Sequence, residues 1–150
     1  MHMDIRRANA SDVEALQELY MKHLTQSPPE EPQVQAHWSA LLKSLSERPD
    51  YHLLVGEADG KVVASVTLII IQNLTHNLRP YGVIENVVTH GDFRKKGYAS
   101  ALMARAGEIA QESKCYKIML MTGSKKEETL RFYERCGFSR HEKTAFLRRL

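Results

Sequence analysis

The chain lacks a long apolar run. Its longest such run, residues 62–71, is interrupted by Ser65 and Thr67 and is about half as long as a helix that crosses a bilayer. It predicts a buried strand, and no membrane partner is expected. The opening residues, MHMD, contain no basic segment followed by an apolar stretch, so we expect no secretory signal and a cytoplasmic location.

Cysteine is scarce, and several nucleotide and metal motifs are absent. Cys115 and Cys136 form no C-x-x-C pair, so neither a disulfide nor a zinc site is expected. The seven histidines show no spacing such as H-E-x-x-H, and we predict no metal site. The sequence also lacks G-x-x-x-x-G-K-[ST], G-x-G-x-x-G and G-x-S-x-G, which argues against a P-loop, a dinucleotide fingerprint and a nucleophile elbow.

Net charge is also modest. The formal charge is +3 with a pI of about 8.9, and no basic stripe with interleaved aromatic residues is present, so no nucleic-acid partner is expected. With 43% apolar and 26% charged residues, the 150-residue chain has the composition of one globular domain. We therefore predict a single domain over residues 1–150.

The apolar periodicity predicts a mixed α/β fold. Residues 3–7 form a first strand, and a capping box from Ser11 to Glu14 opens a helix. A proline-rich loop at residues 27–32 precedes a second helix over residues 34–45. Next comes a hairpin of residues 51–57 and 61–72, with Asp59-Gly60 as its turn.

The second half of the chain continues this pattern. It predicts strands at residues 81–89, 115–121 and 138–147. One helix follows residue 97, and another begins at a capping box from Ser124 to Glu127 and stops at Gly137. Hairpin pairing together with a strand–helix–strand crossover predicts a mixed, mostly antiparallel twisted sheet flanked by about four helices.

The most informative stretch is residues 84–110, IENVVTHGDFRKKGYASALMARAGEIA. A strand breaks into a basic, glycine-containing turn, and an amphipathic helix follows at once. The first N–H groups of a helix have no partner within it, and the helix dipole adds positive charge there. Because Gly97 has no Cβ, an anion can approach the chain closely. This joint predicts a pyrophosphate site.

Two motifs then carry a resemblance to a known family. R-x-x-G-x-A at residues 94–99 resembles the pyrophosphate loop of the Gcn5-related N-acetyltransferases, usually written Q/R-x-x-G-x-G/A. FYERCGF at residues 132–138 resembles the closing helix of that family, and a predicted strand separates the two motifs as the family requires. Within the family, IENVV and CYKI…FYERCGF are most similar to the glucosamine-phosphate N-acetyltransferase branch.

The resemblance implies direct transfer of an acetyl group from acetyl-CoA to a primary amine, on a small molecule (amino sugar, amino acid or polyamine) or a peptide. It also allows a homodimer. The loop implied to bind the pyrophosphate is Arg94, Lys95, Lys96, Gly97, Tyr98 and Ala99. The main-chain groups implied to pair with pantetheine are those of Val87, Val88 and Thr89. Many members carry an Asn on the pantetheine arm where this chain has Lys126, which could instead touch a cofactor phosphate or be solvated.

Tyr133, Glu85 and Asn86 are the candidates for the chemistry. Tyr133 matches the family tyrosine, and a phenol is a suitable proton donor to a departing thiolate; the alternative is an aromatic core residue. Glu85 lies in an apolar run, where a carboxylate is costly unless it is paired or protonated. It is either the base that accepts the ammonium proton or a structural carboxylate that binds a loop or a substrate hydroxyl. Asn86 is expected to contact the substrate or a loop.

The acceptor cannot be read from the sequence. The resemblance places it against residues 24–46, which include Glu30, Glu31, His37 and Trp38 in no known pattern. Acidic residues favour a cationic acceptor, whereas the branch resemblance favours an amino-sugar phosphate. The alternative function is a catalytically weak acyl-CoA-binding sensor or regulatory module.

Overall fold

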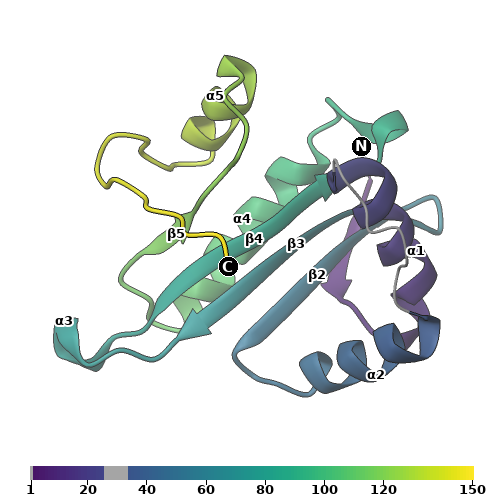
Figure 1. The fold of residues 1–150 in the computed structure, drawn as a ribbon, viewed down its shortest axis with the longest axis horizontal. Helices are drawn as coiled ribbons and strands as arrows, with labels where there is room; N and C mark the ends of the chain where they lie inside the picture. The colour runs from purple at the N-terminus through teal and green to yellow at the C-terminus, as the bar shows by residue number, and fades with distance from the viewer. Residues whose placement is uncertain (1, 26–33) are drawn as a thin grey trace.

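The protein is described by a computed structural model that covers residues 2–25 and 34–150. Five strands form one sheet in the order β1-β2-β3-β4-β5 (Figure 1). The first four neighbour one another antiparallel, and β5 is parallel to β4. The mixed, mostly antiparallel sheet is thus confirmed. The strands are β1 (Asp4–Arg7), β2 (Tyr51–Ala58), β3 (Lys61–Ile71), β4 (Tyr81–Thr89) and β5 (Ile118–Leu120).

The β2–β3 hairpin turns where the sequence predicts. Asp59 and Gly60 both have positive φ, 53° and 73°, as a two-residue type I′ turn requires. The predicted loop at residues 27–32 lies outside the described residues.

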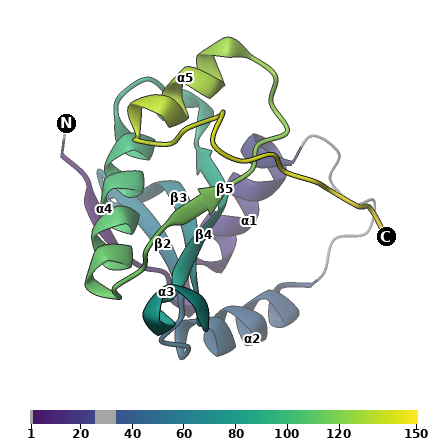
Figure 2. The ribbon, with the colours of Figure 1, turned by 90° about the vertical axis from the view of Figure 1, so that its left-hand side faces the viewer.

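Helices cover both faces of the sheet (Figure 2). One face packs against α4 (Tyr98–Glu112), whose buried Leu102 and Ala106 belong to the core cluster that contains Val66 and Ile84. The second core cluster lies on the other face and contains Leu16, Leu19 and Leu42. These come from α1 (Val13–Glu18), the π-helix η2 (Leu19–Leu24) and α2 (Gln35–Ser46), which follow the short 3-10 helix η1 (Ala10–Asp12). No helix in the two described ranges is long and apolar enough to span a membrane.

Both predicted capping boxes are wrong in detail. Asn9, not Ser11, caps the first helical turn, and its partner is the carboxylate of Asp12. Asp12 is held by Arg6, which also binds Glu57 at 2.9 Å and so ties β1 to β2. The last helix, α5 (Glu127–Arg135), begins one residue after Lys126, and no side chain caps it.

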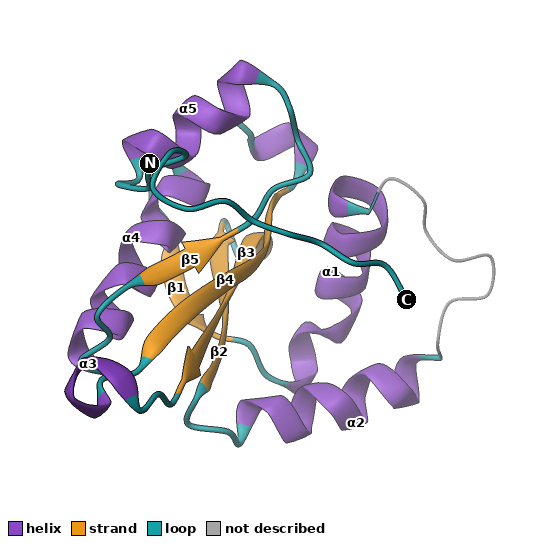
Figure 3. Cartoon of the chain, turned by 60° about the vertical axis from the view of Figure 1, so that its left-hand side comes forward, coloured by secondary structure: helices purple, strands orange, loops and turns teal. Residues whose placement is uncertain are grey.

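The last third departs most from the prediction. The strand expected over residues 115–121 is paired only at Ile118–Leu120, and residues 138–147 form no strand. Arg140 explains the direction of the chain there, since it binds Glu127 at 2.9 Å and Glu134 at 2.6 Å on α5. The following segment has no apolar alternation that one face of a sheet could bury. It runs as an exposed loop outside the sheet (Figure 3).

Candidate active site

A fork between β4 and β5 forms the centre of the candidate site. The two strands pair only from Gly82–Ile118 to Ile84–Leu120, although β4 continues to Thr89. Beyond the last pair, no strand among the described residues pairs with the edge of β4 that faces away from β3. A cavity of about 210 Å³ opens there, and it is lined by residues that include Leu24, Glu85, Asn86, Met121, Thr122 and Tyr133.

A β-bulge shapes β4 at the fork. Glu85 pairs with Thr67 and Val88 with Ser65, so Asn86 and Val87 together oppose the single residue Val66. Asn86 has φ 53°, a conformation that asparagine tolerates better than most residues. A bulge bends a strand and leaves backbone groups outside the ladder. The free backbone of residues 85–89 can therefore bind an extended, amide-containing ligand.

The predicted pyrophosphate loop leads into α4 as expected. Gly97 is the N-cap with φ 84°, and no side chain caps the helix. The first backbone N–H groups of this 15-residue helix are consequently left for a ligand. Lys95, Lys96 and Gly97 are exposed, whereas Tyr98 is buried beneath the loop. Uncapped donors beside a helix dipole favour an anion.

The three cations of this loop differ in their contacts. Arg94 folds back, since its guanidinium donates to the carbonyls of Thr89 at 3.4 Å and His23 at 3.3 Å. Lys95 lies 3.7 Å from the exposed Glu128, and Lys96 lies over the ring of Phe93. Exposed ion pairs and exposed cation–π contacts contribute little, so both lysines are available to an anion, whereas the Arg94 guanidinium is occupied by these two carbonyls.

Tyr133 borders the fork from α5. Its ring is half-buried and touches the core cluster on the α4 face. The centroids of the Tyr133 and Phe132 rings are 5.1 Å apart. Burial, and after it the Cys136 thiol, raise the pKa of Tyr133 above its ordinary value, so the phenol keeps its proton at neutral pH. A Schellman ending fixes the helix, with the Phe138 N–H donating to the Tyr133 carbonyl at 3.1 Å. Tyr133 therefore packs against the core cluster and lines the cavity at the same time.

Two predicted residues are placed differently from expectation. Glu85 is not buried among apolar side chains but exposed at the cavity. The prediction that its carboxylate is shielded from water is therefore wrong. Lys126 is the exposed N-cap of α5, and it is not among the residues that line the cavity. Asn86 lines the cavity, and its contact with a substrate stays a prediction.

The sequence did not single out a cluster of Glu18, His23 and His90 beside the fork. Their ligand atoms lie within 4.8 Å of one another. However, His23 Nδ1 accepts the Gly91 N–H at 3.1 Å, and His90 Nδ1 accepts the Asp92 N–H at 3.2 Å. These two hydrogen bonds occupy Nδ1 of both rings, so neither Nδ1 has a lone pair left for a metal ion. His90 is buried and packs against its neighbours; it does not line the cavity.

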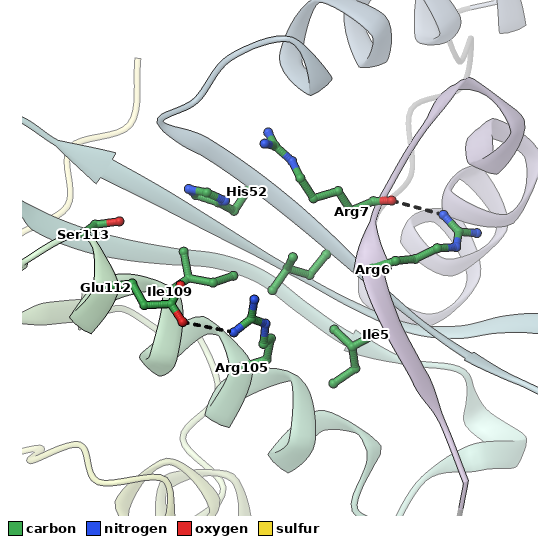
Figure 4. A pocket seen from close by; sticks show the side chains of 9 residues that line it. Ile5, Arg6, Arg7, His52, Arg105, Ile109, Glu112 and Ser113 are labelled. Carbon is green, nitrogen blue, oxygen red and sulfur yellow. Dashed lines mark hydrogen bonds and ion pairs between the residues drawn. The ribbon is translucent and has the colours of Figure 1, made fainter.

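A larger cavity of about 340 Å³ lies elsewhere, between α4 and the strands β1 and β2 (Figure 4). Its cationic side chains are already engaged. Arg105 binds Glu108 at 2.9 Å and Glu112 at 3.6 Å, and Arg7 donates to the carbonyls of Arg48 and Tyr51. This cavity lies along the later turns of α4, from Arg105 to Ser113, and not at the uncapped first turn of that helix. We do not assign the chemistry to it.

Comparison with known proteins identifies the family of this chain. The family described as "Acetyltransferase (GNAT) family" matches residues 13–138. The chain belongs to this family. It is 30% identical to a glucosamine 6-phosphate N-acetyltransferase of Trypanosoma brucei brucei, over 94% of this chain and 92% of that protein. A putative acetyltransferase of Agrobacterium tumefaciens is similar in structure, with TM-score 0.86, 37% identity and coverage of 97% and 99%.

Another glucosamine 6-phosphate N-acetyltransferase, of Candida albicans, is 31% identical over 68% of this chain and 63% of that protein. The protein is an acetyl-CoA-dependent N-acetyltransferase, because membership of this family implies acetyl-CoA as the acetyl donor.

Gly97 tests the pyrophosphate loop. Gly97→Glu places a carboxylate where the pyrophosphate is predicted to lie, and we expect the Kd for coenzyme A, measured by calorimetry, to rise at least tenfold, about 1.4 kcal/mol. Gly97→Gln is the matched control, since it introduces the same backbone strain and nearly the same bulk without charge. It should lose less affinity than Gly97→Glu. Wild-type affinity in the Glu variant would contradict the assignment.

Proposed function

We propose that the protein acetylates the amino group of glucosamine 6-phosphate or a closely related amino-sugar phosphate. The similarity to the trypanosomal enzyme of that name, which spans nearly the whole of both chains, carries this proposal. The cavity at the fork supports it, because about 210 Å³ suits a small acceptor. Acidic residues between positions 24 and 46 would instead favour a cationic acceptor, but Glu30 and Glu31 lie outside the described residues.

We infer that acetyl-CoA lies along the fork. Its pyrophosphate would accept hydrogen bonds from the uncapped N–H groups at the start of α4, with Lys95 and Lys96 beside it. Its pantetheine arm would pair with the backbone of Val87, Val88 and Thr89, which β5 leaves free. The thioester carbonyl carbon would then be attacked by the acceptor nitrogen at the cavity between Asn86 and Tyr133. In this arrangement the protein supplies mainly position and orientation.

Two proton transfers complete the reaction. As the carbon–sulfur bond breaks, the Tyr133 hydroxyl gives its proton to the sulfur and recovers one from solvent. In the described part of the chain this hydroxyl makes no hydrogen bond that would have to break first. The acceptor nitrogen loses its proton to the Glu85 carboxylate or to water. Glu85 is exposed at the same cavity, so it is equally well placed to bind an acceptor hydroxyl.

An acceptor panel tests the proposed substrate. Release of free coenzyme A thiol should be measured with glucosamine 6-phosphate, glucosamine, amino acids, spermidine and a short peptide. A charge-assisted contact to the phosphate contributes about 1.5–3 kcal/mol, so kcat/KM for glucosamine 6-phosphate should exceed that for glucosamine at least tenfold. Equal values for the two sugars, or a preference for spermidine, would refute the phosphorylated acceptor. No turnover with any amine, together with tight coenzyme A binding, would favour a binding module.

Tyr133→Phe tests the proton donor. The substitution keeps the ring that packs against Phe132 and removes only the hydroxyl. The turnover number should fall roughly 10²-fold, a typical value for the loss of one acid–base group, while coenzyme A affinity stays unchanged. Phe132→Leu is a control for packing, and should affect stability more than chemistry. Wild-type turnover in Tyr133→Phe would make the tyrosine structural.

Glu85→Gln separates the two roles of that residue. If Glu85 accepts the ammonium proton, the variant should lose kcat and the rise of its rate with pH should follow only the free acceptor amine. If Glu85 binds a hydroxyl of the acceptor, the acceptor KM should rise with kcat little changed. Steady-state kinetics between pH 6 and 9 distinguish these outcomes. A variant with wild-type kcat, KM and pH profile would exclude both roles.

A further inference from the structure

His23 connects the pyrophosphate loop to the opposite wall of the site. It lies in η2, far from the loop in sequence, yet it makes one hydrogen bond to the 3-10 helix η3 (Gly91–Phe93), which leads directly into the loop, and one to Arg94 in the loop itself. The Gly91 N–H donates to His23 Nδ1 at 3.1 Å, and Arg94 Nη2 donates to the His23 carbonyl at 3.3 Å. The ring also lies directly against Gly91, with its Cε1 and Nδ1 only 3.5 Å from where a Cβ would stand.

The rest of the loop is weakly held. Residues 94–97 are exposed, and the bond from Arg94 Nε to the Thr89 carbonyl is 3.4 Å long. The ion pair of Lys95 and Glu128 lies between two exposed side chains at 3.7 Å. Long or exposed contacts of these kinds contribute little. Among these contacts the 3.1 Å bond from the Gly91 N–H to His23 is the shortest, and together with the Arg94 bond it ties the loop and the segment ahead of it to η2.

A chain of rings continues from His23 to the start of α4. The ring centroids of His23 and His90 are 4.2 Å apart, those of His90 and Phe93 5.6 Å, and those of Phe93 and Tyr98 6.1 Å. Tyr98 is the first residue of α4 and is buried. The position of the His23 ring is thereby transmitted, by packing, to the N–H groups that are assigned to the pyrophosphate.

The neighbour of His23 faces the other half of the site. Leu24 lines the cavity together with Glu85, Asn86 and Tyr133. Both residues belong to the same π-helix, a rare element that is often found at functional sites. One turn of chain therefore contacts both the acceptor cavity and the cofactor loop.

The ring can perform this role only when it is neutral, because a protonated Nδ1 cannot accept the Gly91 N–H. Four charged or titratable groups face it: His90 and Arg94, which disfavour a positive ring, and Glu18 and Asp92, which favour one. Burial has the largest effect, and together with His90 and Arg94 it lowers the pKa of His23 below the ordinary 6.5. The neutral arrangement is consequently complete above about pH 6.5 and is lost as the pH falls through the lowered value.

We propose that His23 is a positioning residue that orders the pyrophosphate loop through its neutral imidazole and couples that loop to the wall of the acceptor cavity. The identity of the ligand rests on the function proposed above, whereas the link between His23 and the loop does not. An experiment can therefore refute the proposed ligand and leave the link between His23 and the loop intact, or the reverse.

Two substitutions isolate the ring. His23→Leu places an apolar side chain against Gly91 and removes the hydrogen-bond acceptor Nδ1. Arg94 can still donate to the backbone carbonyl of residue 23. Without ligand, the amides of residues 91–97 should exchange hydrogen severalfold faster than in the wild type. The Kd for coenzyme A at pH 7.5 should rise about fivefold, on the order expected for one neutral hydrogen bond. Wild-type exchange together with wild-type Kd would overturn the proposal.

His23→Asn places an amide oxygen near the position of Nδ1, and this acceptor does not titrate. It should restore the exchange protection and the affinity at pH 7.5. Between pH 7.5 and 5.5 the wild type should lose more affinity for coenzyme A than His23→Asn does, because only the His23 ring titrates. Titration of the coenzyme A phosphates is common to both proteins and does not contribute to this difference. His141→Asn, on the exposed C-terminal segment, is the control and should follow the wild type.

Each outcome decides one point. An identical pH dependence in His23→Asn and the wild type would overturn the role of the neutral ring. If the wild type binds no coenzyme A while His23→Leu still loosens the loop, the proposed function fails and the link stands.

Discussion

The parting of β4 and β5 is the constraint on which the site depends. Pairing ends at Ile84 and Leu120, and the bulge at Asn86 and Val87 bends β4 just beyond that point. A parallel pair that continued to Thr89 would use the backbone groups that a ligand needs and would close the cavity. Three paired residues are enough to hold β5 because Ile118 and Leu120 also pack on the α4 face of the core. The sheet thus forms fewer hydrogen bonds of its own and leaves an open edge, along which we propose that acetyl-CoA lies.

The elements around the fork bring three kinds of group to it. Helix α4 is pressed onto the sheet by Leu102 and Ala106, and this packing directs its uncapped first turn toward the end of β4. Helix α5 contributes Tyr133, and η2 contributes Leu24 from the other face of the sheet. The buried side chain of Val88 fixes the strand whose backbone is then free to bind. Rigid packing beneath exposed backbone donors is what a preorganised site requires.

The sequence predicted the parts of this arrangement whose signals are local. The Asp59-Gly60 turn, the strand at residues 81–89 and the glycine at the start of α4 each follow from one residue type with one backbone preference. The shortness of β5 and the missing last strand were not predictable in this way, because pairing depends on partners distant in sequence, and Arg140 finds its carboxylates only once α5 has folded. Glu85 is exposed just where the pairing of β4 with β5 ends at Ile84, an end point that no pattern in IENVV indicates. His23 escaped notice for the same reason, since its partner Gly91 is 68 positions away.

Amide chemical shifts on addition of coenzyme A test the central claim most directly, because they report each backbone group separately in a chain of 17.1 kDa. The account predicts that the largest shifts fall on two separate segments, residues 87–89 at the fork and residues 97–100 at the start of α4. The amides around the larger cavity, near Arg7, His52 and Arg105, should not change. Shifts centred on that second cavity, with residues 97–100 unaffected, would contradict it.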